Sequence, residues 1–318
     1  MKIIAKILRK IYRAFHPHQA YNHITIPDED VSDFLLHQLE SNQPFCMVRF
    51  GNGEFLSMQY GYLMSESKWK RVKSYIRGFN TSYKPEVKIG EEALKTISFF
   101  SGFFPRDIQL LDRFYKLMLD SLSDVDLLGV VPWNKEDLFA EYYSSQIEYC
   151  GYDRFEPYDY AEPWTKALEG KKVLVIHPFA KTIEAQYARR ELLWRNKDVL
   201  PKFDLITMKA VQSLCDEDTE FDTWFDALAY MEHEIDKIDF DVAIIGCGAY
   251  SFPLAVYCKR KGKQAIQLAG ATQILFGIKG KRWDDNPAVS KFYNEYWVRP
   301  LPEETPKQSE KVENGCYW

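Results

Sequence analysis

The chain has 318 residues, enough for two ordinary domains or one large α/β domain. Hydrophobic residues make up 46% and charged residues 27%, values that exclude a disordered, collagen-like or coiled-coil chain. The net charge of −5 gives no overall field that would attract a polyanion, so nucleic acid is not an expected partner.

The first fifteen residues predict an amphipathic helix, set apart from the body as a segment of residues 1–20. At about 100° per residue, apolar side chains fall on one half of the helical wheel and basic side chains on the other. Cations recur every few residues, so the segment lacks the apolar run of an export signal. A helix on an anionic membrane surface and a helix docked on the protein's own core fit the pattern equally well. The apolar residues are Ile3, Ile4, Ile7, Leu8, Ile11, Tyr12 and Phe15, and the basic residues are Lys2, Lys6, Arg9, Lys10 and Arg13.

The body of the chain predicts an α/β fold with a Rossmann-like, mostly parallel sheet flanked by helices. Short runs rich in Val, Ile and Phe alternate with longer amphipathic stretches, such as residues 224–235, which is typical of β–α units. The alternation is regular from residue 172 to 268. It indicates a C-terminal lobe, 166–300, after an N-terminal lobe, 21–165. The expected strands are residues 45–50, 127–131, 172–177, 203–208, 241–246 and 263–268.

Two segments have no clear period. Residues 150–165 are aromatic and acidic, and they are compatible with a linker or with an active-site loop. Residues 301–318 combine Pro302 and Pro306 with Glu, Lys and Ser, which predicts a flexible tail.

The cysteine pattern indicates the compartment. Six cysteines are scattered without a C-x-x-C pair, so free thiols in a reducing, cytoplasmic compartment are expected. The longest charge-free stretch, residues 242–258, is shorter than a transmembrane helix. We therefore expect a cytoplasmic protein that can lie on the inner face of the membrane through residues 1–15.

The first candidate site is the segment R-F-G-N-G-E, which ends the first expected strand. Ligands of α/β sheets bind at the carboxyl ends of strands, and Gly51 and Gly53 would permit close backbone approach. Arg49 could clamp a phosphate through its planar guanidinium group. Glu54 could bind a divalent cation or a sugar hydroxyl. The alternative is an Asn52-Gly53 turn between two hairpin strands, with Glu54 in solvent.

A second glycine-rich turn, G-C-G-A-Y-S, follows the fifth expected strand. Gly246 and Gly248, with Tyr250 nearby, nearly match a G-x-G-x-x-G pattern, in which amides at a helix start bind a pyrophosphate. The next strand lacks the acidic residue that would hold an adenosine ribose, so nicotinamide cofactors are disfavoured. A close-packed turn without a ligand is equally compatible.

Three further segments carry groups that could contact a phosphate. His177 and Lys181 follow the third expected strand and could bind phosphate or transfer a proton, although such a histidine is often structural. Lys279 lies in a basic, glycine-rich loop, 277–283, which could also be a surface turn. Residues 68–77 interleave cations with aromatics and could bind a phosphorylated lipid or single-stranded nucleic acid, or form a solvated helix face.

The R-F-G-N-G-E segment and the late block GCGAYSFPLAVYCKRKGKQAIQLAG together resemble the GT-D fold glycosyltransferases. The segments ATQILFGIKGKRW and NEYWVRP look like relatives among bacterial surface-polysaccharide proteins. In that family an R-F-G-D-G-E motif carries an Asp-x-Glu pair that supports metal-dependent binding of a nucleotide sugar on a Rossmann-like sheet. The resemblance implies transfer of a sugar from a nucleoside diphosphate donor, a UDP-sugar first of all, to a glycan or lipid-linked acceptor.

The resemblance also implies roles for particular residues. Glu54 and Asn52 would be catalytic, and a divalent metal, Mn²⁺ or Mg²⁺, would bind Glu54. Together with the phosphate-contacting candidates named above, these give the residues expected to bind the nucleotide sugar: Arg49, Gly51, Gly53, His177, Lys181, Gly246, Gly248, Tyr250 and Lys279.

Asn52 departs from the family pattern because it replaces the first acid of the pair. An amide oxygen is a weaker, neutral ligand for a hard dication, so three outcomes stay open. The metal binds through Glu54 and the pyrophosphate, or Arg49 and the basic loop neutralise the leaving group without an ion, or the enzyme is inactive. The alternative functions are a nucleotide-dependent oxidoreductase or methyltransferase, and a non-catalytic nucleotide-sugar or glycan-binding protein.

Overall fold

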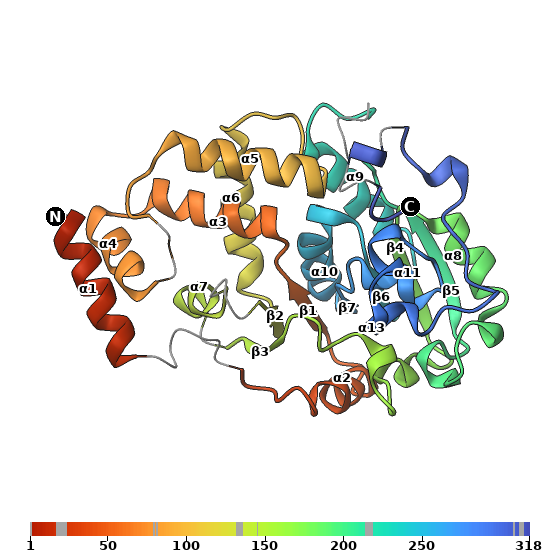
Figure 1. Ribbon diagram of the computed structural model, residues 1–318. Helices are drawn as coiled ribbons and strands as arrows, with labels where there is room; N and C mark the ends of the chain where they lie inside the picture. Colours follow the sequence, from red (N-terminus) through yellow and green to blue (C-terminus); the bar gives the residue numbers. More distant parts are fainter. Residues whose placement is uncertain are drawn as a thin grey trace.

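A computed structural model describes residues 2–16, 24–78, 80, 82–131, 136–144, 146–213, 219–307, 309–311 and 315–318. These residues form one seven-stranded sheet between two layers of helices (Figure 1). The predicted α/β fold with a Rossmann-like parallel sheet is thereby confirmed.

The strands follow the order β3-β2-β1-β7-β6-β4-β5, and every neighbouring pair is parallel. Six strands match the expected ones. The edge strand β3 was missed because its four residues, E-Y-C-G, form too short a run to stand out beside the aromatic segment that follows. The strands are β1 (Phe45–Arg49), β2 (Leu127–Val130), β3 (Glu148–Gly151), β4 (Lys172–His177), β5 (Asp204–Lys209), β6 (Val242–Ile245) and β7 (Gln264–Ile266).

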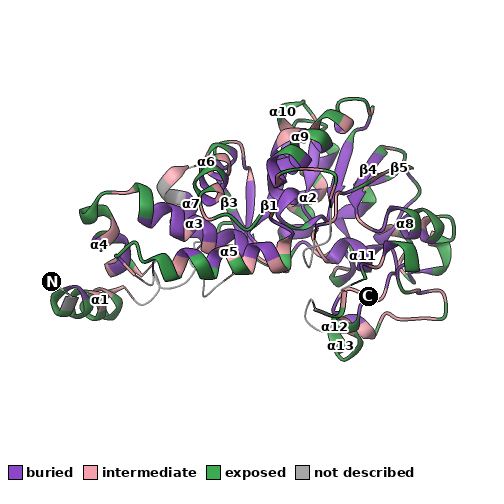
Figure 2. Cartoon of the chain, turned by 90° about the horizontal axis from the view of Figure 1, so that it is seen from above, coloured by how far each residue is buried: buried purple, intermediate pink, exposed green. Residues whose placement is uncertain are grey.

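Helices cover both faces of the sheet, so the hydrophobic core has two halves. Alternate residues of β1 enter the two halves, with Cys46 and Val48 on one side and Phe45 and Met47 on the other, as the pleat of a strand requires. Figure 2 shows buried residues concentrated in the sheet and on the helix sides facing it. The first face carries α3 (Asn52–Ser65), α5 (Val87–Ser101), α6 (Leu110–Leu122), α7 (Glu136–Tyr143), α9 (Trp224–Ile235) and α10 (Ser251–Arg260). The second carries α2 (Val31–Glu40), α8 (Ala180–Tyr187), α11 (Ala271–Leu275) and α13 (Pro287–Ser290).

Both expected lobes contribute to this one sheet. Strands β1, β2 and β3 come from residues 21–165 and the other four from residues 166–300. The two sets join where β1 pairs with β7, with Cys46 opposite Ala265. Each half of the core contains residues from both lobes, so the lobes share one hydrophobic interior.

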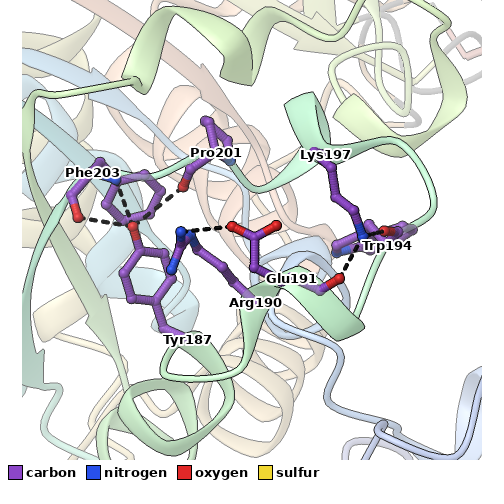
Figure 3. A network of polar contacts seen from close by, with 7 residues as sticks. All are labelled: Tyr187, Arg190, Glu191, Trp194, Lys197, Pro201 and Phe203. Atoms are coloured by element: carbon purple, nitrogen blue, oxygen red, sulfur yellow. Dashed lines mark hydrogen bonds and ion pairs between the residues drawn. The ribbon is translucent and has the colours of Figure 1, made fainter.

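The connection between α8 and β5 is fixed by a tyrosine hydroxyl (Figure 3). Tyr187, the last residue of α8, accepts the N–H of Phe203 at 2.6 Å and donates to the Phe203 carbonyl at 2.8 Å. Within the same connection Arg190 pairs with Glu191 at 2.7 Å, and the Lys197 ammonium donates to the Glu191 carbonyl. These contacts hold the chain that enters β5 against the second face.

The described part of the tail after residue 300 is packed, and this corrects the expectation of a flexible end. Glu304 is 3% exposed, and its carboxylate accepts the amides of Lys181 and Thr182 at 2.8 and 3.1 Å, at the start of α8. The Trp283 ring of α12 (Lys281–Asp284) lies 6.0 Å from the Tyr317 ring. The partners of the tail are distant in sequence, so composition alone indicated flexibility.

The predicted N-terminal helix is present as α1 (Lys2–Phe15). It packs against α4 (Lys68–Arg77), at the end of the molecule away from the C-terminus (Figure 1). Among the residues that the structure describes, no helix has the length and apolar character needed to cross a membrane.

Candidate active site

A cavity of about 430 Å³ opens at the carboxyl ends of the strands. Its walls include Arg49 from β1, His177 from β4, Ser213 beyond β5, Gly246 after β6 and Gln267 after β7. The chain moves from β1 toward one edge of the sheet and from β4 toward the other, so the cavity lies where the strand order reverses. Crevices at this position are the usual ligand sites of open α/β sheets.

The cavity brings together residues from four of the predicted segments, the fourth being the basic loop 277–283, whose Arg282 and Trp283 line it. Asn52, Gly53, Lys181 and Lys279 do not line it. The predicted residues that line it are Arg49, Gly51, Glu54, His177, Gly246, Gly248 and Tyr250.

Glu54 is a buried carboxylate in the cavity wall, in the first turn of α3. Its side chain is 5% exposed, and Oε2 has no hydrogen-bond partner among the described residues. Burial raises the pKa of the Glu54 carboxyl, while hydrogen bonds from its own backbone N–H and the Ser101 hydroxyl act in the opposite direction. A Cβ atom at Gly51 would lie 2.2 Å from Oε2, so only glycine lets the carboxylate fold back over the start of the helix.

The segment after β1 is the start of a helix rather than a hairpin turn. α3 begins at Asn52, whose side chain is exposed outside the cavity. Gly53 faces α5, where a Cβ atom would lie 2.6 Å from the Cα of Ile97. The alternative of a turn with Glu54 in solvent is therefore wrong.

Arg49 is buried and already bonded to backbone on both sides of the cavity. Its Nη1 donates to the Tyr152 carbonyl at 3.0 Å and its Nη2 to the Leu268 carbonyl at 2.7 Å. The guanidinium carbon also lies 4.4 Å from the Tyr152 ring centre and 4.6 Å from that of Phe155. Arg49 thus ties the chain after β3 to the chain after β7, and it places a buried positive charge in the wall.

His177 is held as a neutral ring. The Phe179 N–H donates to Nδ1 at 3.0 Å, which leaves the proton of the neutral ring on Nε2. Burial lowers the pKa of His177 to about 3. The ring is therefore neutral at neutral pH and can donate a hydrogen bond from Nε2.

The G-C-G-A-Y-S turn needs glycine at two positions. A Cβ atom at Gly246 would lie 2.5 Å from the Ala269 carbonyl oxygen. Gly248 has a φ of +61°, and a Cβ there would lie 2.7 Å from the Ser101 carbonyl oxygen. The Tyr250 ring stacks on Trp224 with ring centres 4.9 Å apart. The turn is close-packed, as one alternative expected, and it also lines the cavity.

Lys181 and Lys279 lie elsewhere. The Lys181 ammonium is 3.7 Å from Glu303, and the amide of Lys181 is bonded to Glu304. The sequence suggested that a phosphate could bind at the first turn of α8. In the structure the amides of this turn bind the carboxylate of Glu304 instead. The Lys279 ammonium lies 5.2 Å from the Tyr293 ring centre.

Sequence reasoning missed several wall residues. Residues 150–165, for which the sequence left a linker and an active-site loop open, form part of the wall, but none of the individual residues was singled out: Tyr152, Glu156 and Tyr158 line the cavity. The Tyr158 hydroxyl donates to Glu156 at 2.6 Å, and burial raises the pKa of Glu156 while the charge of Arg49 lowers it. The acidic, aromatic composition of this segment was the signal. Nothing in the sequence marked Tyr317 and Trp318, which line the cavity from the tail.

Within the described residues, the cavity wall does not gather a complete set of protein ligands for a metal ion. In the described part of the chain, no three His, Cys, Asp or Glu side chains gather to hold an ion. Asn52 points away, and Glu156 already accepts a hydrogen bond from Tyr158. Glu54, whose Oε2 has no hydrogen-bond partner among the described residues, could contribute one carboxylate ligand to a divalent cation.

Comparison with known proteins defines the family. A model described as a GT-D fold-like domain matches residues 26–275. Because this match covers most of the chain, the protein belongs to the GT-D fold-like family, and its fold is of the glycosyltransferase type that the sequence resemblance indicated. No curated protein and no solved structure matches the chain significantly.

Proposed function

We propose that this protein is a glycosyltransferase that moves a sugar from a nucleoside diphosphate donor to a glycan or lipid-linked acceptor. The observation that carries the proposal is Glu54, a buried carboxylate with an unpartnered oxygen in the wall of the cavity at the strand ends. A carboxylate in this state is costly without a ligand, and the family fold supports a nucleotide sugar as that ligand.

The reaction breaks the bond between the anomeric carbon and the diphosphate oxygen and forms a bond from that carbon to an acceptor hydroxyl. The acceptor proton must leave, and negative charge develops on the departing diphosphate. Glu54, whose pKa is raised by burial, is suited to accept that proton or to orient a donor hydroxyl. The buried charge of Arg49 and the Nε2–H of His177 favour the departing anion.

The aromatic wall supports a nucleotide as the donor. Trp283, Tyr317 and Trp318 are partly exposed at the cavity, and Arg282 donates to the Tyr317 hydroxyl at 3.0 Å. Flat rings beside a guanidinium suit stacking with a base, and we propose UDP as the nucleotide. If a divalent cation accompanies the diphosphate, Glu54 is the residue that would hold it, and the cation would neutralise the leaving group.

A ligand screen followed by two variants tests the proposal. A nucleoside diphosphate sugar, with Mn²⁺ or Mg²⁺ or without, should raise the melting temperature, because saturation at 100 times Kd adds about 2.7 kcal/mol to the free energy of unfolding. Glu54→Gln should then lower turnover by about ten-fold or more. Asn52→Ala is the matched control in the same turn and should keep wild-type turnover.

Three outcomes would contradict the proposal. A melting shift with S-adenosylmethionine or a nicotinamide nucleotide, and none with nucleoside diphosphates, would favour a methyltransferase or an oxidoreductase. Donor binding without hydrolysis or transfer would indicate a non-catalytic binding protein. Wild-type turnover in Glu54→Gln would remove this cavity as the active site.

A further inference from the structure

The N-terminal helix docks on the body by one narrow edge. Ala5 is 2% exposed and packs with Val72, Tyr75 and Tyr83. The Arg9 guanidinium carbon lies 4.4 Å from the Tyr75 ring centre, and its Nη1 donates to the Asn80 carbonyl at 3.0 Å. The contact with α4 therefore uses a small residue and a cation rather than the large apolar side chains of α1.

The apolar face of α1 consequently points to solvent. Ile3 is 73% exposed and Phe15 is 78% exposed, and the neighbouring helix α4 adds Trp69 at 77%. Large apolar side chains gathered on one surface mark an interaction site, whereas scattered ones are ordinary. The exposed apolar residues of the two helices are Ile3, Ile4, Ile7, Leu8, Ile11, Phe15 and Trp69.

The same two helices are strongly basic. Each carries five Lys and Arg residues and neither carries an Asp or Glu, while the whole chain has a net charge of −5. An open groove of about 680 Å³ runs between them, with Leu8, Trp69 and Ile76 among its apolar walls. Lys73 and Arg77 also line this groove, and no ion pair joins either one to an acid within the described residues.

We propose that α1 and α4 together form a docking surface for an anionic lipid bilayer. The aliphatic side chains of α1 and the Trp69 ring enter the interface, while Lys73 and Arg77 meet lipid phosphates at the groove. In the sequence analysis the two helices were separate candidate segments. Because they pack against each other, their exposed side chains form one surface. This inference is independent of the proposed glycosyl transfer.

Charge complementarity selects this occupant over others. In a symmetric pair of copies, two surfaces that each carry these cations and no acids on α1 or α4 would face each other and repel. Nucleic acid would match the cations but would leave the isoleucine face in water. An anionic bilayer satisfies both the apolar and the basic parts.

Vesicle flotation with the full chain tests the proposal. We expect binding to vesicles of phosphatidylcholine with phosphatidylserine, at least about ten-fold weaker binding to phosphatidylcholine alone, and weaker binding at high salt. Ile7→Glu with Ile11→Glu should lose binding by about ten-fold or more, and so should Lys73→Glu with Arg77→Glu. The matched controls are Leu192→Glu, an exposed leucine at 46% like Ile11, and Lys95→Glu on α5.

The variants change exposed side chains, so their circular dichroism and melting temperatures should match wild type. Equal binding to neutral and anionic vesicles, or binding unaffected by either double variant, would overturn the proposal. A dimer in light scattering that Ile7→Glu with Ile11→Glu dissociates, without vesicle binding, would assign the face to self-association instead.

Discussion

Gly246 offers a stringent test of the cavity geometry. In Gly246→Ala the new Cβ would lie 2.5 Å from the Ala269 carbonyl oxygen and 2.6 Å from the Thr272 hydroxyl. Neither side can yield easily, because the Gly246 N–H is bonded to Ile176 at 2.9 Å and the Ala269 N–H to Ile245 at 3.0 Å. Two pieces of sheet backbone must therefore separate by about 0.5 Å or more in a close-packed interior.

The expected cost is about 1–3 kcal/mol of unfolding free energy, the usual range for overpacking. For a protein of 318 residues that corresponds to a fall in melting temperature of roughly 1–5 °C. Donor binding should weaken as well, because the same Cβ would lie 2.8 Å from the His177 ring. Urea unfolding, calorimetry and titration calorimetry with the donor measure these effects.

Gly270→Ala is the matched control from the same cavity. Gly270 has φ −63° and ψ −25°, which alanine adopts readily, and its nearest neighbours would be 3.4 to 3.5 Å from a Cβ. The control should change unfolding free energy by about 1 kcal/mol or less, with stabilisation from the stiffer unfolded chain. If Gly246→Ala is as stable as Gly270→Ala, the close approach of β6 to the chain after β7 is refuted.

Three further predictions concern His177 in the cavity wall and two residues near the cavity, Glu304 and Asn52. Because the pKa of His177 is about 3, below its ordinary 6.5, the histidine contributes stability that is complete above pH 6.5 and is lost as pH falls toward 3. Between pH 7 and pH 5 wild type should lose about 2 kcal/mol more than His177→Gln in urea unfolding, and parallel curves would contradict this. Glu304→Gln should lower the free energy of unfolding by about 1–3 kcal/mol and weaken donor binding, because the carboxylate anchors the tail that carries Trp318. If the variant is less stable but binds the donor with wild-type affinity, the tail is not part of the site. Asn52→Asp should leave metal response unaltered because the side chain lies outside the cavity, and a stronger Mn²⁺ requirement in activity assays would place it beside Glu54.

The sheet was predictable because buried parallel strands are continuous apolar runs with turn signals after them. The R-F-G-N-G-E segment gave Glu54 and Gly51 because strand ends and paired glycines have general physical meanings. The same rules could not show that Asn52 turns outward, since adjacent residues of a helix start point in different directions. The sequence also could not separate the hairpin turn from the helix start, because both use glycine.

The wall from the tail was not predictable for a different reason. Glu304 reaches the start of α8 from a position 122 residues further along the chain, and its hydrogen bonds exist only once the sheet has formed. Local composition contains no information on such long-range contacts, and prolines and charges taken alone indicate a flexible segment. The same long-range contact explains why the sequence suggested a phosphate beside Lys181. The amides of that helix turn, which could bind an anion, already donate to the Glu304 carboxylate.

Helix α3 sets the distance between the cavity and the exposed surface of α1 and α4. Its first turn holds Glu54 in the cavity, and its last residue, Ser65, lies three positions before α4. Figure 1 shows α3 running between β1 and α4. Fourteen residues at about 1.5 Å each span roughly 21 Å. If the proposed glycosyl transfer and the proposed bilayer docking both hold, a hydroxyl in the headgroup layer would stay out of reach of Glu54, while the far end of a longer glycan would arrive there. The length of α3 would then determine how long a membrane-anchored sugar chain must be before its end reaches Glu54.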